Sequence, residues 1–310
     1  SIEPVERAGC YAPGGRFPLP SSVLMTAVTA RVAGGPEVIV ASPRPAAVTK
    51  AAAAVAGADA LLVVGGAHAI AAMAYGAGPV RACDAIVGPG NRWVTGAKQL
   101  VSGSVRIDML AGPSELVVLV DGSADARTVA ADLLAQAEHD TDASAILVTT
   151  SSGLADEVER ELEAQLETLP TSETARAALS NGFVVVVGSI DEGIDVCDRI
   201  APEHLEVMTE GAGEVASRLR HYGGLFVGSR SAEVLGDYGA GPNHTLPTGG
   251  TARSFGGLSV FDFLRVRTWM EIDDEEAAQG LVRDSVELAR LEGLEGHARS
   301  AACRLGPAGR

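Results

Sequence analysis

Short apolar runs alternate with longer amphipathic stretches along most of the chain. Runs such as VIVA at 38–41 and ALLVV at 60–64 are unbroken by polar residues, the pattern of strands buried on both faces. The stretches between them repeat apolar residues at helical spacing. Strands are therefore expected at 38–42, 60–66, 84–90 and 105–109 in the first part of the chain, and at 115–121, 144–150, 183–189, 205–209 and 224–229 in the second.

The turn AGPS at 111–114 divides this alternation into two βαβ-type series, each typical of a parallel sheet covered by helices. The Gly-, Pro- and Asn-rich segment from Ser231 to Phe255 predicts an ordered functional loop. Residues 273–304 are predicted to form charged helices that dock on something. The expected fold is α/β, with two Rossmann-like α/β units at 1–114 and 115–260, and a helical C-terminal tail at 261–310 that crosses to a partner subunit.

Composition restricts the possible partners. A formal charge of −16, a pI near 4.8 and the lack of a basic run disfavour nucleic acid and favour a small-molecule ligand. The apolar segment 51–80 contains Asp59, Gly65 and His68, so helix packing in a soluble protein is expected and no membrane span. Four cysteines without a CxxC pair, and no leader pattern at the start, favour a cytoplasmic location.

Histidines near other ligand-type residues suggest a metal site. Gln136 and His139, in AQAEHD at a helix end, are three residues apart and share one helix face. Asp237 in the Gly-rich segment and His297 in the tail would complete a four-coordinate set suited to zinc. Each residue also has a simpler interpretation, as a helix-end histidine, an Asx turn or a solvated helix face.

Two further patterns indicate acid–base chemistry and a nucleotide. In IAPEHLEV at 200–207, Glu203 and His204 follow Pro202, on a turn entering a strand where diverging side chains could reach one cleft. The alternative is a solvent-exposed glutamate beside a packed histidine. The turns VVGGAHA and VGPGNRW could cradle a pyrophosphate at a helix N-terminus, although tight turns alone would account for their glycines.

Taken together, these segments resemble the histidinol dehydrogenase family. The resemblance runs in the family's order from Tyr11 to His297, and its most specific parts are APEHLE and GDYGAGPNHTLPTGGTAR. It implies a homodimeric enzyme of histidine biosynthesis that oxidises L-histidinol through L-histidinaldehyde to L-histidine in two NAD-dependent steps. It also implies a zinc ion that holds the substrate.

The resemblance further implies roles for individual residues. Glu203 and His204 would be the catalytic acid–base pair, and the tail's Glu292 and His297 would complete the active site of the neighbouring subunit. The implied sets are Gln136, His139, Asp237 and His297 as zinc ligands; Ser114, His204, His244 and Glu292 at the substrate; and Tyr11, His68 and Asn91 along NAD.

The chemistry divides naturally between the two catalytic residues. A histidine with a pKa near neutrality suits removal of the hydroxyl proton, which is assigned to His204, and Glu203 would activate the water of the second step. Zinc would orient the substrate rather than polarise the reacting carbon.

Two departures from the family keep an alternative open. His68 stands where the family commonly has Gln, and the sequence lacks the helical region that usually precedes VERAGCYAPGG. A truncated paralogue that oxidises a different alcohol is therefore the nearest alternative. A non-catalytic two-lobed binding protein is the alternative from another class, and it would have no use for an acid–base pair beside metal ligands.

Overall fold

The structure, a computed structural model, describes residues 1–14 and 18–306. Residues 15–17 of the AGCYAPGG segment and residues 307–310 of the predicted tail lie outside the described residues. Two compact units are present, a larger one of Pro4–Arg265 and a smaller one of Ser1–Glu3 with Val266–Arg310. The division of the chain at residues 114 and 260 stays a prediction.

The larger unit contains two parallel sheets, each with five strands in the part of the chain described. In the first, the strand order is β4-β3-β2-β5-β6. The chain therefore enters this sheet at its central strand β2, adds β3 and β4 on one side of it, and then adds β5 and β6 on the other side. The first sheet and its helices comprise β2 (Arg7–Tyr11), α1 (Pro20–Val32), β3 (Glu37–Ala41), α2 (Ala47–Val55), β4 (Ala60–Leu62), α3 (Gly66–Tyr75), β5 (Ala85–Val87), α4 (Arg92–Val101) and β6 (Arg106–Ile107).

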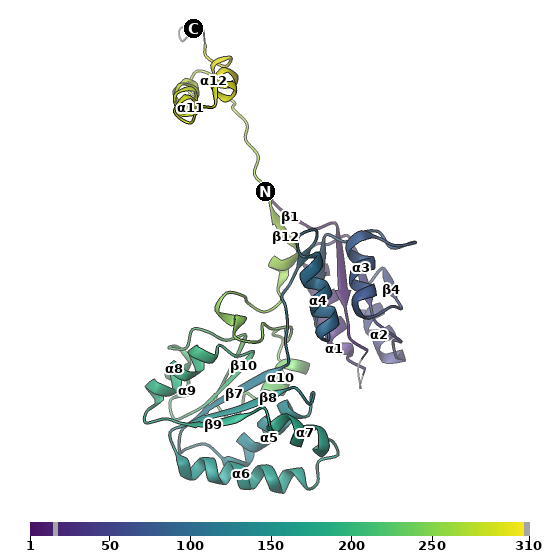
Figure 1. The fold of residues 1–310 in the computed structure, drawn as a ribbon, viewed down its shortest axis with the longest axis vertical. Helices are drawn as coiled ribbons and strands as arrows, with labels where there is room; N and C mark the ends of the chain where they lie inside the picture. Colours follow the sequence, from purple (N-terminus) through teal and green to yellow (C-terminus); the bar gives the residue numbers. More distant parts are fainter. Residues whose placement is uncertain (15–17, 307–310) are drawn as a thin grey trace. The chain divides into compact units, whose positions relative to one another are not determined.

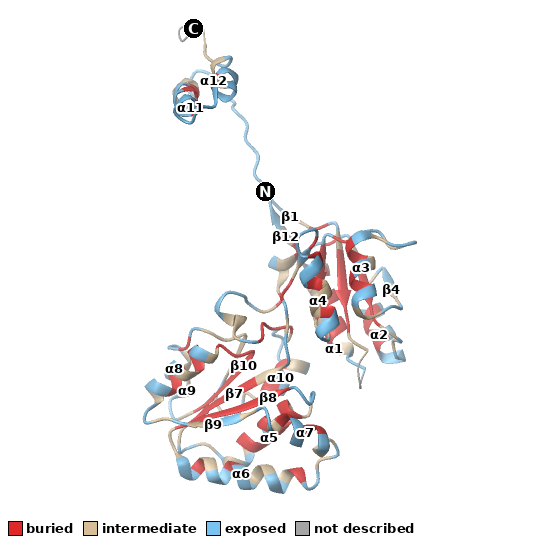
Figure 2. Ribbon diagram, viewed as in Figure 1, coloured by how far each residue is buried: buried red, intermediate tan, exposed pale blue. Residues whose placement is uncertain are grey.

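Helices cover both faces of this sheet, as Figure 1 shows. On one face α1 and α2 pack small apolar residues such as Ala27 and Ala53 against Val38 of β3. On the other face α3 and α4 pack Ile70 and Val94 against the sheet. The buried central strands and the exposed outer sides of the helices are visible in Figure 2.

The second sheet repeats the plan, with the order β11-β10-β7-β8-β9. Its core on one face joins α5 and α6 to the sheet, and its core on the other face joins α8 and α9 to it. The elements are β7 (Glu115–Val120), α5 (Ala126–Ala137), β8 (Ser144–Thr149), α6 (Ser152–Leu166), α7 (Ser172–Leu179), β9 (Phe183–Val186), α8 (Ile190–Ile200), β10 (His204–Met208), α9 (Ala212–Ala216), β11 (Gly224–Val227), α10 (Glu233–Tyr238), and the 3₁₀ helices η1 (Thr251–Arg253) and η2 (Val260–Phe263).

Local sequence explains where these elements begin and end. The run ELVVLV of β7 has no polar residue after Glu115, and every later position is buried between the two helical layers. Ser151 and Ser189 cap α6 and α8 with their side chains. The predicted α/β class with two Rossmann-like units is confirmed.

Two parts of the larger unit differ from the sequence prediction. The central strand β2 and the helix α1 were not expected. The strand was missed because RAGCY contains no run of β-branched residues. The segment from Ser231 to Phe255 is not loop throughout, since α10 occupies residues 233–238. This short helix carries part of the site described below.

The smaller unit contains the predicted tail helices, α11 (Gln279–Leu291) and α12 (Glu295–Ala302). They pack on each other through Val286, Ala289 and Ala298. β1 (Ile2–Pro4) and β12 (Leu264–Val266) form a two-stranded sheet, and the division between the units falls within both strands. Within residues 1–14 and 18–306, no helix has the length and apolar character needed to cross a membrane.

Candidate functional site

The predicted acid–base pair lies where the chain enters β10. Helix α8 ends at Ile200, Ala201 follows with a left-handed φ of 53°, and the strand begins at His204. Because β10 runs parallel to β7, with His204 opposite Leu116, the turn before β10 lies beside the start of β7. Glu203 is thereby brought to Ser114, although the two are far apart in the sequence.

A chain of hydrogen bonds holds Glu203. Its Oε2 atom accepts from Ser114 Oγ at 2.7 Å and from the Glu115 backbone N–H at 3.1 Å. Ser114 Oγ accepts in turn from Gln136 Nε2 at 2.9 Å. Burial raises the pKa of Glu203 to about 8, against the effect of these hydrogen bonds. At neutral pH this carboxyl therefore exchanges readily between its protonated and ionised forms.

His204 is buried as a neutral imidazole. Its Nδ1 atom lies 3.2 Å from the backbone oxygen of Glu115, and since a carbonyl only accepts, we assign the ring proton to Nδ1. Burial lowers the pKa of His204 to about 4. The other nitrogen, Nε2, is therefore an unprotonated base at neutral pH, 3.5 Å from Glu233 Oε1.

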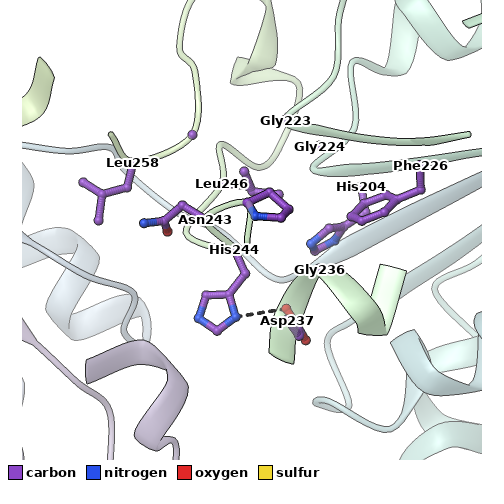
Figure 3. A pocket seen from close by; sticks show the side chains of 12 residues that line it. His204, Gly223, Gly224, Phe226, Gly236, Asp237, Asn243, His244, Leu246 and Leu258 are labelled. Atoms are coloured by element: carbon purple, nitrogen blue, oxygen red, sulfur yellow. Dashed lines mark hydrogen bonds and ion pairs between the residues drawn. The ribbon is translucent and has the colours of Figure 1, made fainter. Parts of the chain in front are cut away.

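Metal-type ligands gather beside this base. Potential ligand atoms of His139, Glu233 and Asp237 all lie within 4.8 Å of one another. Asp237 Oδ1 is 3.0 Å from His244 Nδ1, as the dashed line in Figure 3 shows. Burial opposes ionisation of Asp237, but this bond and the nearby histidines lower its pKa below the ordinary value.

Two buried oxygens near these ligands lack partners. Gln136 Oε1 and Glu233 Oε1 have no hydrogen-bond partner among the described residues, and the two side chains are 0% and 3% exposed. A buried oxygen without a partner is costly. The positive charge of a divalent cation in this region would offset that cost, and the mixture of imidazole, carboxylate and amide oxygen suits zinc. The residues present therefore fit a metal ion.

A cavity of about 240 Å³ opens onto these groups. In Figure 3 the imidazoles of His204 and His244 and the carboxylate of Asp237 line it, and Phe226 lies beside His204. Its remaining wall is mostly apolar and comes from the segment after α10 and from β11. The cavity therefore combines a base and one metal-type ligand, Asp237, in a space suited to a small molecule.

The residues predicted to lie along NAD surround the carboxyl edge of the first sheet. Tyr11 ends β2, and its hydroxyl accepts a hydrogen bond of 3.0 Å from Gly66 N at the start of α3, two residues before the exposed His68. Asn91 caps α4 with its side-chain oxygen, which leaves its amide nitrogen available. After β5, Gly88 adopts a φ of 113°, and a Cβ there would lie 2.1 Å from Tyr11 O.

This edge is the topological switch point of the sheet, where the chain passes from one side of β2 to β5 on the other. In open α/β sheets, ligands bind at the carboxyl ends of strands at such a point, close to helix N-termini that favour phosphate. The close approach at Gly88 leaves no room for a side chain there. The arrangement fits a dinucleotide.

Comparison with known proteins decides the family. The model of the histidinol dehydrogenase family matches residues 1–305. The chain belongs to the histidinol dehydrogenase family. The family membership predicted from the sequence motifs is confirmed.

The similarity to individual histidinol dehydrogenases is high. The enzyme of Thermus thermophilus is 51% identical over 302 residues, which cover 96% of this chain and 73% of that protein. The enzyme of Bacillus thuringiensis is 47% identical over 310 residues, or 98% of this chain and 72% of that protein. A crystal structure of histidinol dehydrogenase from Elizabethkingia anophelis is 35% identical, with a TM-score of 0.92, over 98% of this chain and 71% of that chain.

Most of the residues that the histidinol dehydrogenase motifs single out therefore lie in the larger unit. Ser114, Gln136, Glu203 and His204 are linked by close contacts. His139, Asp237 and His244 form the adjoining group. Glu292 and His297 are exposed residues of the smaller unit, at the end of α11 and in α12, and their roles stay predictions.

Sequence reasoning missed a cluster of buried acids behind the site. Glu233 precedes Asp237 by one helical turn, and its backbone N–H donates to Glu206 Oε1 at 2.7 Å. Burial, followed by the charge of Asp237, raises the pKa of Glu233 to about 8. Glu206 is 1% exposed, and burial, followed by the charge of the neighbouring Asp132, raises its pKa to about 8 also. The i, i+4 spacing of Glu233 and Asp237 was the available signal, but it lay in a segment predicted as loop.

Proposed function

We propose that the protein oxidises L-histidinol through L-histidinaldehyde to L-histidine, with NAD as the oxidant, in histidine biosynthesis. Membership of the histidinol dehydrogenase family supports the substrate and the reaction. The observation that carries the proposal is the neutral, buried imidazole of His204, which lines a cavity together with Asp237 and His244 and lies beside the carboxyl of Glu203.

In the first oxidation, His204 takes the hydroxyl proton of the alcohol. Its Nε2 atom is unprotonated at neutral pH, because burial keeps the pKa near 4 and Nδ1 carries the proton. The Glu115 carbonyl holds the ring in that tautomer. NAD supplies the hydride acceptor when bound, and Tyr11, His68 and Asn91 would hold it.

In the second oxidation, Glu203 takes a proton from the water that adds to the aldehyde. A general base works best with a pKa near the working pH, and the pKa of about 8 meets this condition. Roughly a tenth of the carboxyls would be ionised at pH 7. Ser114 and the Glu115 N–H both donate to Oε2, which fixes the carboxyl and leaves its other oxygen for the water.

Gln136, His139 and Asp237 would hold zinc, together with His297 of a partner subunit. Zinc, when bound, would anchor the nitrogen atoms of the substrate and so orient it. His244 bonds Asp237 through Nδ1 and so fixes the carboxylate as an outer-shell partner does. Ser114, His244 and the partner's Glu292 would contact the substrate.

A homodimer with shared active sites is part of this proposal. The tail helices expose Leu281, Leu288 and Leu291, which are 56%, 58% and 78% accessible. All three lie on α11, and such an apolar series on one small helix favours an interface. The free cysteines Cys10, Cys83, Cys197 and Cys303 support a reducing compartment, and we propose the cytoplasm.

Separate assay of the two half-reactions tests the division of labour. Glu203→Gln should slow oxidation of L-histidinaldehyde more than it slows oxidation of L-histidinol, because only the second step needs an activated water. NADH formation from each substrate is followed at saturating NAD. An equal loss in both half-reactions would contradict the assignment of Glu203, and activity on other alcohols but not on L-histidinol would contradict the substrate.

A further inference from the structure

Lys98 and Asp108 form a buried ion pair that the proposed mechanism leaves without a task. Their side chains are 3% and 0% exposed, and the Lys98 ammonium contacts Asp108 Oδ1. Lys98 lies on the inner face of α4 between Val94 and Val101, which pack on the first sheet, and Asp108 directly follows β6. A buried ion pair adds little net stability, because the cost of removing two charges from water offsets their attraction. Stability alone therefore does not account for a charged pair at this position.

Both partners of the ion pair bond to the backbone of Gly88, in the turn after β5. Asp108 Oδ2 accepts a hydrogen bond of 2.7 Å from the Gly88 N–H, and Lys98 Nζ donates one of 3.0 Å to the Gly88 carbonyl oxygen. Gly88 has a φ of 113°, a conformation that favours glycine, and glycine loses the most backbone freedom when it is ordered. The pair therefore fixes a residue that is otherwise costly to hold in place.

The turn that begins at Gly88 leads directly into groups proposed to hold NAD. Gly88 lies so close to β2 that an added Cβ would be 2.1 Å from Tyr11 O, and the turn ends at Asn91, the N-cap of α4. Asn91 and Lys98 are about two helical turns apart, so one rigid helix joins the cap to the ion pair. Both Tyr11 and Asn91 are proposed to hold NAD, so the pair fixes the backbone that adjoins them.

We propose that Lys98 and Asp108 are positioning residues for NAD, because they hold the turn from Gly88 to Asn91 in the conformation that receives the dinucleotide. The inference deepens the proposed function and rests on its use of NAD. Without the pair, the turn would have to be ordered when the dinucleotide binds, and the cost of that ordering would weaken binding. The metal-type ligands belong to the second sheet and its helices, so the expected defect is confined to the dinucleotide.

Binding of NADH to the whole chain, followed by fluorescence in the absence of L-histidinol, tests the proposal without turnover. The double variant Lys98→Met/Asp108→Asn buries no unpaired charge, so it should fold. Its dissociation constant for NADH should rise about tenfold or more, the factor that about 1.4 kcal/mol of binding free energy represents. The KM for NAD should rise in parallel, whereas the KM for L-histidinol at saturating NAD and the zinc affinity should change by less than about twofold.

Hydrogen exchange of the unsubstituted protein provides a second test that does not depend on the folding of a variant. If the ion pair orders the turn in advance, the Gly88 amide should exchange slowly without nucleotide, and NADH should slow it further by less than about twofold. In the double variant the same amide should exchange faster, and NADH should slow it. Fast exchange in the unsubstituted protein that NADH slows would overturn the inference, because the nucleotide would then order the turn.

Lys50→Met is the matched control for the binding experiment. Lys50 is the other lysine of the chain and is exposed on α2, so its replacement should leave NADH affinity unchanged. A folded double variant that binds NADH as tightly as the unsubstituted protein would overturn the inference. A loss of zinc affinity equal to the loss of NADH affinity would also overturn it, because that result indicates a general defect. Failure of the unsubstituted protein to bind NADH would instead overturn the proposed use of NAD, and the inference with it.

Discussion

Replacement of Glu206 by glutamine is expected to remove part of the pH dependence of stability. Glu206 lies in β10 and is 1% exposed, with Oε1 bonded to the Glu233 backbone and Oε2 without a partner among the residues described. Burial first, and then the charge of Asp132, raises its pKa from 4.5 to about 8. Glutamine has nearly the same shape but does not titrate in this range.

The sign and size of the effect follow from the raised pKa. Between pH 4.5 and pH 8 the folded chain holds a proton on Glu206 that the unfolded chain has released. This stabilisation is therefore full below pH 4.5, decreases steadily as the pH rises, and is lost once the pH passes 8. Each pH unit in this window changes the free energy of unfolding by about 1.4 kcal/mol. From pH 6 to pH 8 the loss attributable to Glu206 is therefore about 2 kcal/mol.

Urea unfolding followed by circular dichroism at pH 6, 7 and 8 measures this loss. A chelator in all samples removes bound metal ions, so that a change in metal binding with pH does not contribute to the measured difference. The unsubstituted protein should lose about 2 kcal/mol more between pH 6 and pH 8 than Glu206→Gln does. Glu159→Gln, at an exposed position on α6, should follow the unsubstituted protein. An identical pH dependence for Glu206→Gln and the unsubstituted protein would refute the reasoning.

Two other substitutions test the surroundings of the sites. Lys98→Met leaves Asp108 buried without its ion-pair partner and should lower the free energy of unfolding by about 3–5 kcal/mol. The double variant with Asp108→Asn should recover most of that loss, and a double variant no more stable than the single one would contradict this. Ser114→Ala removes a hydrogen bond that lowers the pKa of Glu203, and should slow aldehyde oxidation roughly tenfold or more. Its pH–rate profile should move to higher pH, and an unshifted profile would argue against Glu203 as the base.

Most of the fold could be predicted because its strands are unusually apolar. The runs in β7 and β8 are buried on both faces, and such runs need no tertiary information to be recognised. The strand β2 was missed because RAGCY has neither alternation nor a β-branched run. Its structure is decided by β3 and β5, which pair with it on both sides, and no local pattern reports such pairing.

The sequence predicted which residues form the candidate site, but it did not predict how they are arranged in space. Motifs identified Ser114 and Glu203, yet their contact depends on the register of β10 against β7, which no local pattern specifies. Glu233 was missed for a different reason. Its six-residue helix contains Gly236 and precedes a segment rich in Gly and Pro, so local propensity favoured a loop. Packing of α10 against α5, and the bond from Glu233 N to Glu206 of β10, override that preference.

The most direct test of the proposed function is the number of NADH molecules formed per L-histidinol consumed, measured with and without a chelator. The account predicts two NADH per L-histidinol, loss of this turnover on chelation, and its recovery when zinc is added. One NADH per substrate, or turnover that chelation does not affect, would contradict the account of a metal-dependent, two-step oxidation.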